Sequence, residues 1–429
     1  MLDIRLIRER PDLVRENIKR RHDSAHVKLL DQLVKDDEKL RKLVAEVNGL
    51  RAQRNSISLE IAKLKKSGKD TDAKKKMKEA ASIPDKIKKA EAGQAEVETR
   101  AKEALMRLPN MLHESVPYGK DDTQNVEIRR WGKQPKFDFK PKGHLEILQD
   151  LDLIDVERGV KVAGHQFFYM KDELVLLDMA LQRFAIDHLR SKNFTVINPP
   201  YMINRKAYAG MIDPGDFEMV TYKIDGEDFY LIATSEHPMG AMLMDETLDA
   251  SQLPIKFCGV SPCFRKEVGA HGKYTRGLFR MHQFHKVEQF IFCAPEDSWK
   301  FHEELQKNSE ELYQKLGLHY RVVNICTGDI GTIAAKKYDI EAWMSDGKFR
   351  EVGSNSNCTD YQARRLNIKW REGEGKPPAG FVHTLNNTAI ATSRTMIAII
   401  EQFQQKDGSV VIPEVLRPYM NGTEKLEKN

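Results

Sequence analysis

The sequence has little cysteine and no long apolar run. Its five cysteines in 429 residues form no CxxC pair and no Cys/His cluster, so neither a disulfide framework nor a structural zinc site is expected. No uninterrupted apolar stretch approaches the roughly 18 residues that a membrane span needs. The opening MLDIRLIRERPDLVREN carries acids and lacks the apolar stretch of a secretory signal. We therefore expect a protein of the reducing cytoplasm.

The common nucleotide-binding signatures are also missing. No GxxxxGK[ST] or GxGxxG motif follows a predicted strand, which argues against the phosphate-loop and dinucleotide-binding folds. Predicted strands and helices do not alternate regularly, as a doubly wound parallel sheet would require. The apolar fraction of 40% is nevertheless ordinary for a globular chain, and the length suggests two or three domains.

The first quarter of the chain has helical periodicity. Apolar residues recur at heptad positions a and d over residues 27–66, with Arg54 as an interruption. A turn signal follows at residues 67–70. A second helical pattern covers residues 80–108, in which a bend or a frayed turn is expected near Pro84. Together these patterns predict an antiparallel coiled-coil hairpin, with an arm roughly 60 Å long at 1.5 Å per residue.

Positive charge is concentrated around the turn of this hairpin. Residues 61–90 hold eleven lysines and four acids, whereas the whole chain has a net charge of only +5. A solvated charged face is the simplest interpretation, but charge of one sign at an exposed tip favours a polyanion partner. The segment has no aromatic residue for stacking bases, so contact with a phosphate backbone is predicted. The lysines proposed for it are Lys63, Lys65, Lys66, Lys69, Lys74, Lys75, Lys76 and Lys78.

After a polar linker, the composition changes to aromatics, glycines and β-branched runs. A helix is predicted over 173–189 and another over 396–403. Short strands are predicted at 195–197, 229–232, 256–260 and 287–292.

Arginine and aromatic side chains gather around one predicted hairpin. If residues 256–264 and 282–292 are antiparallel strands, a glycine-rich basic loop joins them and Arg265, Arg280, Phe284 and Glu288 lie near one another. Arginine binds phosphate or carboxylate in a bidentate manner, and Phe284 could stack a base. A charged surface hairpin with a core phenylalanine is an equally good interpretation of these residues alone.

Three weaker signals lie elsewhere. Glu351 with a hydroxyl at Ser354 suits an oxygen-ligated Mg²⁺ that bridges phosphates, although such residues are also common in loops. Arg394, at the start of a predicted helix, could lie over a nucleotide or cap a surface. The tripeptide at residues 234–236 combines hydroxyls with a carboxylate suited to an ammonium group.

These pieces, in this order, resemble the seryl-tRNA synthetases, a family of class II aminoacyl-tRNA synthetases. The amino terminus and the linker LPNMLHESVPYGKDDTQN are similar to those of the family. FRKE…TRGLFRMHQFHKVEQF resembles class II motif 2, and residues 198–200 (Asn-Pro-Pro) stand where motif 1 is expected. GDIGTIAAKKYDIEAW, REVGSNSNCTDYQARR and HTLNNTAIATSRTM, the last containing motif 3, resemble the downstream signatures.

The resemblance implies an α+β protein, a homodimer and a cytoplasmic ligase. Residues 1–108 would form a tRNA-binding domain whose coiled-coil arm spans about 27–108, and 109–131 a linker. Residues 132–420 would form the catalytic domain, an antiparallel β-sheet flanked by helices, followed by a polar tail at 421–429. Serine would attack the α-phosphate of ATP, giving seryl-adenylate and pyrophosphate, and the tRNA ribose would then take the seryl group.

The resemblance also assigns residues to ATP. Arg265 would bridge the α-phosphate and the serine carboxylate, and Arg280 would hold the γ-phosphate. Phe284 and Arg394 would sandwich the adenine, whose amino group Glu267 would read. Arg265, Arg280 and Arg394 are the implied catalytic residues. The full implied ATP set is Arg265, Lys266, Glu267, Arg280, Met281, Phe284, Glu351, Val352, Gly353, Ser354 and Arg394, with Mg²⁺ held by Glu351 and Ser354.

The remaining implications concern serine and tRNA. The implied serine-binding residues are Thr234, Ser235, Glu236, Arg265, Glu288, Asn386 and Thr388. A pocket that hydrogen-bonds a hydroxyl rejects alanine, because its polar groups would be left unpaired. The arm would grip the long variable arm of serine tRNA, and of selenocysteine tRNA where that tRNA exists.

Two other functions are consistent with parts of the pattern. One is a synthetase-like ligase that loads an amino acid onto a carrier protein, but such relatives lack the long arm. The other is an inactive RNA-binding paralogue, which would be expected to lose Arg265, Glu351 or Arg394, whereas all three are present.

Overall fold

The computed structural model describes residues 1–215, 217–267 and 277–428. They divide into a helical unit, residues 2–19 and 23–108, and a larger α+β unit that contains Met1, residues 20–22 and the chain from Pro109 onward.

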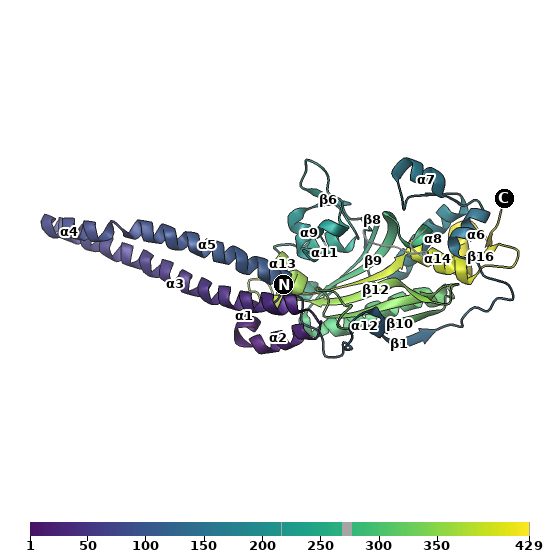
Figure 1. Ribbon diagram of the computed structural model, residues 1–429, viewed down its shortest axis with the longest axis horizontal. Helices are drawn as coiled ribbons and strands as arrows, with labels where there is room; N and C mark the ends of the chain where they lie inside the picture. Colours follow the sequence, from purple (N-terminus) through teal and green to yellow (C-terminus); the bar gives the residue numbers. More distant parts are fainter. Residues whose placement is uncertain (216, 268–276, 429) are drawn as a thin grey trace. The chain divides into compact units, whose positions relative to one another are not determined.

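The helical unit is a long hairpin. Its helices are α1 (Ile4–Glu9), α2 (Pro11–Lys19), α3 (Ser24–Lys66), α4 (Asp70–Ala80) and α5 (Ile83–Arg107). The helices α3 and α5 lie side by side (Figure 1). Leu33, Val47 and Ile57 of the predicted a/d seam are buried, and Ile57 packs with Ile83 and Ile87 of α5. These contacts confirm the predicted coiled-coil hairpin.

The hairpin differs from the prediction in two places. Helix α3 begins three residues earlier than residue 27, because Asp23 caps it by accepting hydrogen bonds from the backbone N–H groups of Ala25 and His26. The returning half of the hairpin is two helices instead of one, and the break at residues 81–82 lies close to Pro84, where a bend or a frayed turn was predicted. Pro84 lies in the first turn of α5, where its missing N–H removes no helical hydrogen bond.

The α+β unit is built on an eight-stranded sheet. In spatial order the strands are β1 (Val126–Trp131), β10 (Tyr320–Asn324), β11 (Lys336–Trp343), β12 (Phe349–Thr359), β15 (His383–Ala391), β9 (Gln283–Cys293), β8 (Ile255–Phe264) and β4 (Thr195–Ile197). Every neighbouring pair is antiparallel except β4, which runs parallel to β8. The predicted antiparallel sheet, including the β8–β9 hairpin, is confirmed.

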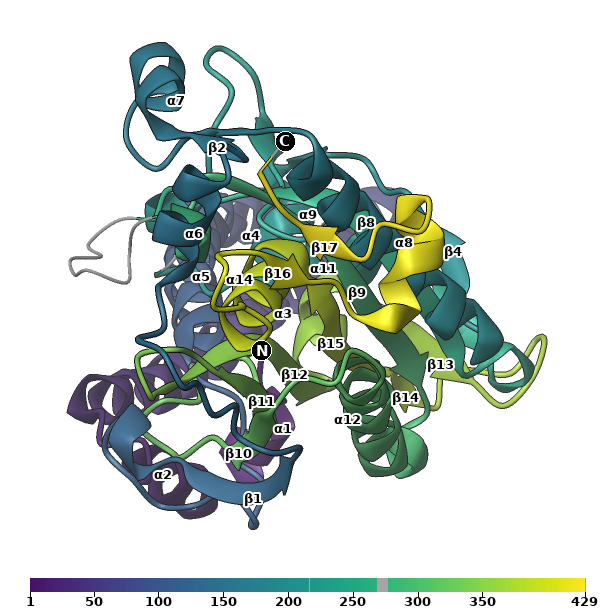
Figure 2. The same ribbon diagram turned by 90° about the vertical axis from the view of Figure 1, so that its right-hand side faces the viewer.

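The two faces of this sheet are covered differently. On β9, Val287 and Ile291 enter the main core, and Gln289 between them donates hydrogen bonds to Leu305 O and Ser309 Oγ. That face is packed by α8 (Glu173–Ser191), α12 (Ser298–Lys315) and α14 (Thr392–Gln402). The opposite face carries α9 (Arg205–Met211), α11 (Glu236–Ala241) and α13 (Tyr361–Leu366), with α9 and α11 across the sheet from α12 (Figures 1 and 2).

The helices on the second face cover only part of it. Phe290 and Phe292 of β9 pack with Met211, Met239 and Leu366 in a second apolar cluster. Lys286 and Glu288 share the face of Phe290 by alternation but lie outside that cluster. This uncovered part of the sheet is where a ligand can reach polar side chains.

Shorter elements complete the unit. The helices are α6 (His144–Asp150), α7 (Val156–Ala163) and α10 (Phe217–Val220), and the 3₁₀ segments include η4 (Gly277–Phe279) and η6 (Glu414–Met420). The short strands are β2 (Ile154–Asp155), β3 (Tyr169–Met170), β5 (Met202–Asn204), β6 (Phe229–Leu231), β7 (Thr247–Asp249), β13 (Lys369–Arg371), β14 (Gly380–Phe381), β16 (Val410–Val411) and β17 (Lys425–Leu426). Among the described residues, no helix is long and apolar enough to cross a membrane.

Two segments that the sequence predicted as irregular take part in strand pairing. Residues 126–131, placed in the linker, form β1 and pair with β10 at the sheet edge. Lys425–Leu426, placed in the polar tail, pair with Val410–Val411. All six side chains of β1 are exposed, and the alternation of Val126 and Ile128 with polar residues ends at Arg129 and Arg130, which is too short a pattern to predict a strand.

We predict opposite stability effects for two glycine substitutions. A Cβ at Gly159 in α7 would lie 2.3 Å from Phe168 Cα and 2.6 Å from Phe167 O, which are backbone atoms that cannot turn away. Gly159→Ala should therefore cost on the order of 1–3 kcal/mol. Gly49 in α3 has no neighbour within 4 Å, so Gly49→Ala should stabilise the helix by about 0.5–1 kcal/mol. Differential scanning calorimetry of both variants tests this, and a Tm unchanged by Gly159→Ala would contradict it.

Candidate active site

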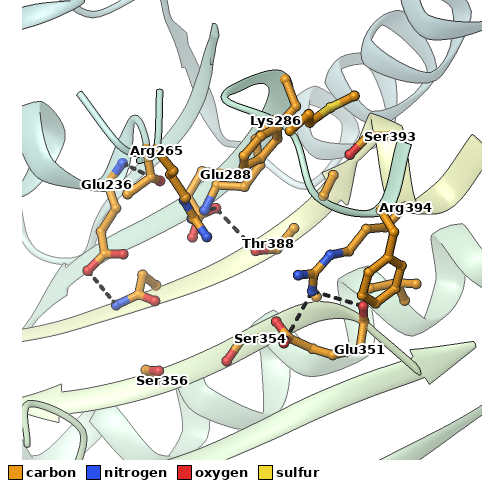
Figure 3. A pocket seen from close by; sticks show the side chains of 18 of the residues that line it. Glu236, Arg265, Lys286, Glu288, Glu351, Ser354, Ser356, Thr388, Ser393 and Arg394 are labelled. Carbon is orange, nitrogen blue, oxygen red and sulfur yellow. Dashed lines mark hydrogen bonds and ion pairs between the residues drawn. The ribbon is translucent and has the colours of Figure 1, made fainter. Parts of the chain in front are cut away.

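A polar cavity of about 270 Å³ opens on the uncovered part of the sheet (Figure 3). Its walls come from the end of β8, from β9, β11, β12 and β15, and from α11 and α14. The lining residues are Thr234, Glu236, Arg265, Glu267, Phe279, Met281, Phe284, Lys286, Glu288, Lys337, Glu351, Val352, Gly353, Ser354, Ser356, Asn386, Thr388, Ala391, Ser393 and Arg394. Four cationic side chains and four carboxylates therefore face one small space.

Strand alternation and one bulge place the side chains of β12. Ser354 and Ser356 are two residues apart and share the cavity face. Glu351 would face the other side of a regular strand. The register shifts from Ile340 opposite Gly353 to Glu341 opposite Glu351, so Val352 is an extra residue in β12. This bulge turns Glu351 to the same face as Ser354.

One end of the cavity holds two carboxylates. Glu236 Oε1 accepts hydrogen bonds from Asn386 Nδ2 at 3.1 Å and from Gln362 Nε2 at 3.3 Å. Glu288, which is 1% exposed, forms an ion pair with Lys286 in which Oε2 and Nζ are 2.5 Å apart. The Thr388 hydroxyl also donates to Glu288 Oε2, at 3.4 Å. This end suits a small ligand that carries an ammonium group and a hydroxyl.

The two carboxylates affect each other's protonation. Burial, together with the nearby Glu288 carboxylate, raises the pKa of Glu236 to about 7. Burial also raises the pKa of Glu288, against the opposing effect of the Lys286 ammonium group. The free site therefore holds a carboxyl group that gains or loses a proton near neutral pH.

The other end of the cavity holds Arg394 and aromatic rings, and Arg265 lies between that end and the two carboxylates (Figure 3). Arg265 donates from Nε to Ala233 O at 3.2 Å, and its Cζ lies 5.2 Å from the centre of the Phe284 ring. Arg394 donates from Nη1 to the Glu351 carbonyl at 3.0 Å and lies 3.2 Å from Glu351 Oε2 (Figure 3). Its Cζ is 4.9 Å from the Phe279 ring centre. Guanidinium groups beside flat apolar rings suit phosphates joined to a base.

The groups near Glu351 fit a divalent cation that is bound with phosphates. Asp339 on β11 pairs in register with Ser354 on β12. Among the described residues, Asp339 Oδ1 and Ser354 Oγ are buried polar atoms without a hydrogen-bond partner. Unpartnered oxygens beside a carboxylate are the donor set that Mg²⁺ prefers when phosphate oxygens supply the rest. Burial raises the pKa of Asp339 to about 7.

Most residues predicted from the sequence line this cavity. Those brought together are Thr234, Glu236, Arg265, Glu267, Met281, Phe284, Glu288, Glu351, Val352, Gly353, Ser354, Asn386, Thr388 and Arg394. Three predicted residues do not line it. Ser235 is buried, and a Cβ at Gly259 would contact its hydroxyl. Lys266 donates its backbone N–H to Val220 O. Arg280 forms an ion pair with the lining residue Glu267, 3.1 Å from its carboxylate.

The sequence interpretation missed six lining residues: Phe279, Lys286, Lys337, Ser356, Ala391 and Ser393. Lys286 could have been found, because it alternates between Phe284 and Glu288 on a strand that was predicted. Lys337 could not, because its place depends on the register of β11 against β12. The glycine-rich basic loop that joins β8 to β9 includes residues 268–276, which lie outside the described residues.

Comparison with known proteins agrees with this architecture. Residues 219–403 match the tRNA synthetase class II core domain of the G, H, P, S and T enzymes. Residues 1–112 match the seryl-tRNA synthetase N-terminal domain. A serine–tRNA ligase of Methanocella arvoryzae is 56% identical over 427 residues, covering 99% of this chain and 100% of the relative.

Two solved structures are similar over nearly their whole length. The seryl-tRNA synthetase of Pyrococcus horikoshii, complexed with ATP, is 47% identical with a TM-score of 0.95, and the alignment covers 100% of both chains. The cytoplasmic serine–tRNA ligase of Naegleria fowleri, in complex with AMP, is 38% identical with a TM-score of 0.88, covering 100% of this chain and 99% of that one.

The antiparallel sheet with its arginine- and carboxylate-lined cavity is the catalytic core of a class II aminoacyl-tRNA synthetase. Matches over the full length then specify the family within that class. The chain belongs to the seryl-tRNA synthetases.

We predict that Glu288→Gln lowers the pKa of Glu236 from about 7, because it removes the nearest like charge. Titration of ¹³C-labelled glutamate carboxyls by NMR in the ligand-free protein measures the shift. Glu267→Gln is the matched control, since it removes a cavity carboxylate that is not among the groups acting on Glu236. A Glu236 titration that is the same in wild type and Glu288→Gln would contradict the prediction.

Proposed function

We propose that the protein is a serine–tRNA ligase that first activates L-serine with ATP and then esterifies tRNA. The observation that carries this proposal is the arrangement of the cavity: a carboxylate and hydroxyl end next to an arginine and aromatic end, with Arg265 between them. An amino acid and a nucleotide would therefore meet in one cavity with their reacting groups adjacent.

The arginine end would bind ATP. Phe284 and Arg394 enclose the adenine, and Glu267 accepts a hydrogen bond from its amino group. Arg280 reaches the γ-phosphate after leaving its ion pair with Glu267. Main chain at Met281, Val352 and Gly353, with Lys266 at the margin, completes the nucleotide site. In this binding mode Arg394 must also leave its ion pair with Glu351 to contact ATP. Nucleotide binding therefore rearranges ion pairs that the free site already contains.

Glu351 and Ser354 would hold Mg²⁺, with Asp339 beside them. The ion supplies charge neutralisation on the phosphates of the leaving pyrophosphate. Release of Glu351 from Arg394 would free this carboxylate for that task.

The carboxylate end would bind serine. The ammonium group lies with Glu236 and the Thr234 hydroxyl, supported by Ser235 behind them and by Asn386, which orients Glu236. The substrate hydroxyl lies between Glu288 and Thr388. An alanine in the same place would leave these buried polar groups unpaired, which is a strong basis for rejection.

The first chemical step needs no protein nucleophile. A serine carboxylate oxygen forms a bond to the α-phosphorus of ATP as the bond to the bridging oxygen breaks, and pyrophosphate leaves with the electron pair. Arg265 contacts both reacting groups and neutralises charge that develops on the α-phosphate. In the second step a terminal ribose hydroxyl of tRNA attacks the seryl carbonyl, and AMP leaves.

The helical hairpin would bind the tRNA. Seven of the eight proposed lysines are exposed, and Lys76 is partly enclosed and paired with Glu60 and Glu79, so it contributes least. We further propose that serine tRNA binds through its long variable arm, that selenocysteine tRNA binds in the same way where it occurs, and that the enzyme works as a homodimer in the cytoplasm.

The proposal is tested by ATP–pyrophosphate exchange without tRNA, with serine, threonine, alanine and glycine in turn. We expect exchange that depends on serine, and its loss in Arg265→Ala, because no other side chain is proposed to contact both reacting groups. No exchange with any amino acid would indicate an inactive paralogue. Exchange that prefers glycine or alanine would instead favour a ligase for a carrier protein.

The arm is tested by reversing charge at its tip. Lys65, Lys66 and Lys69 lie at the end of α3 and in the turn after it. Changing all three to glutamate should lower aminoacylation kcat/KM for tRNA by about tenfold or more at low salt, and leave exchange unchanged, since about one counterion is released per neutralised phosphate. The matched control changes three other exposed lysines to glutamate, Lys28, Lys35 and Lys102, which lie far along the hairpin from the turn. Equal losses in both variants would contradict a role for the tip.

A further inference from the structure

The buried ion pair between Lys286 and Glu288 is not explained by the binding roles proposed above. Both residues lie on β9, two positions apart and on the cavity face. Their side chains are 7% and 1% exposed, and Lys286 Nζ is 2.5 Å from Glu288 Oε2. Two charges taken out of water in this way are costly unless they serve each other or a ligand.

The surroundings of Glu288 would otherwise favour its neutral form. Glu236 from α11 brings a second carboxylate, and the buried thiol of Cys263 lies on the neighbouring strand β8, opposite Phe284. The hydroxyl of Thr388 on β15 donates one hydrogen bond to Glu288 Oε2. Burial and the like charge both oppose ionisation of Glu288.

Two cations can counter these effects, but only one contacts Glu288. Arg265, at the end of β8, donates to Ala233 O and lies over the Phe284 ring. Under the proposed function it is further drawn to the α-phosphate of ATP. Lys286 is therefore the cation in direct contact with the Glu288 carboxylate, whether or not the nucleotide is present.

We propose that Lys286 is a positioning residue for serine specificity: it keeps Glu288 ionised and aimed at the cavity, so that Glu288 accepts the hydrogen bond of the substrate hydroxyl. The proposal rests on the proposed function and goes one step beyond it, because it assigns hydroxyl recognition to a pair of residues. An ionised, immobile acceptor forms a strong hydrogen bond with the serine hydroxyl. When alanine binds, the same buried charge is left without that hydrogen bond.

The ion pair also explains how two carboxylates at one end of the cavity can bind different groups of the same ligand. Glu288 is held by a protein cation and reads a hydroxyl, which is neutral. Among the described residues, the side-chain donors to Glu236 are the amides of Asn386 and Gln362, so Glu236 stays available for the cation of the ligand itself. Without Lys286, both carboxylates would compete for the single ammonium group, and one would be protonated.

The test is ATP–pyrophosphate exchange by Lys286→Met and Lys286→Arg, with serine and with alanine, at about pH 6.5 and about pH 9. For Lys286→Met we expect serine KM at the lower pH to rise by about tenfold or more, with partial recovery at the higher pH as Glu288 ionises. The ratio of kcat/KM for serine over alanine should fall in parallel, and the KM for ATP should change little. Lys286→Arg should restore most of the discrimination.

A spectroscopic measurement supplies a readout that folding alone would not produce. At about neutral pH the ligand-free Lys286→Met protein should show more infrared absorption from protonated carboxyl groups than the wild type, and adding Glu288→Gln should remove this extra absorption. The matched control is Lys256→Met on β8, which removes another partly buried lysine paired with a glutamate, 2.6 Å from Glu304, outside the cavity. This control should keep the serine preference of the wild type.

The possible results distinguish a failure of the proposed role of Lys286 from a failure of the proposed serine-activating function. If Lys286→Met loses activity equally at both pH values and equally for serine and ATP, Lys286 is structural and the inference fails while serine-dependent exchange by the wild type still stands. If Lys286→Met retains the wild-type preference for serine, the inference also fails. If the wild type shows no serine-dependent exchange, the proposed function itself fails.

Discussion

Alternation along β-strands is the constraint on which this protein depends. A strand offers one face to each side of the sheet, so the residues that hold the sheet to its helices and those that meet a ligand must interleave in the sequence. On β9, Val287 and Ile291 belong to the core while Lys286 and Glu288 face the cavity. Bulges in β12 and β15 interrupt this alternation. The bulge in β12 turns Glu351 to the cavity face, which it would not reach on a regular strand.

Charge balance is the second constraint, and it follows from the first. Placing the charged side chains of the site on one face of the sheet crowds four carboxylates and four cations around about 270 Å³. Such a site is stable without ligand only if its charges pair internally, as in Arg394 with Glu351 and Lys286 with Glu288. The first of these pairs is solvent-accessible and can exchange partners, whereas the second is buried and stays closed. The accessible pair of Arg394 and Glu351 can therefore open when a nucleotide binds, whereas the buried pair of Lys286 and Glu288 holds a specificity residue in place.

Much of the architecture could be predicted from local sequence. Heptad spacing predicted the hairpin, because a coiled-coil seam is a repeating pattern in a single stretch of chain. The residues Arg265, Phe284 and Glu288 were identified because they flank one hairpin whose strands are consecutive. The strand β1 was not predicted, because it lies in a polar segment and pairs with β10, which comes much later in the chain. The helix break at residues 81–82 lies next to Pro84, where a bend or a frayed turn was predicted.

By itself, the sequence determined the division into a helical arm and an α+β unit, the basic turn, and the residue types available for chemistry. Tertiary structure decided which of these meet. Lys337 lines the cavity, and Asp339 lies beside Ser354, only through the register of β11 with β12, and Arg280 pairs with Glu267 instead of lining the cavity. The reason is physical: the register and bulges of a sheet depend on contacts between strands far apart in the chain, and a single sequence records the side chains but not which strands will be neighbours.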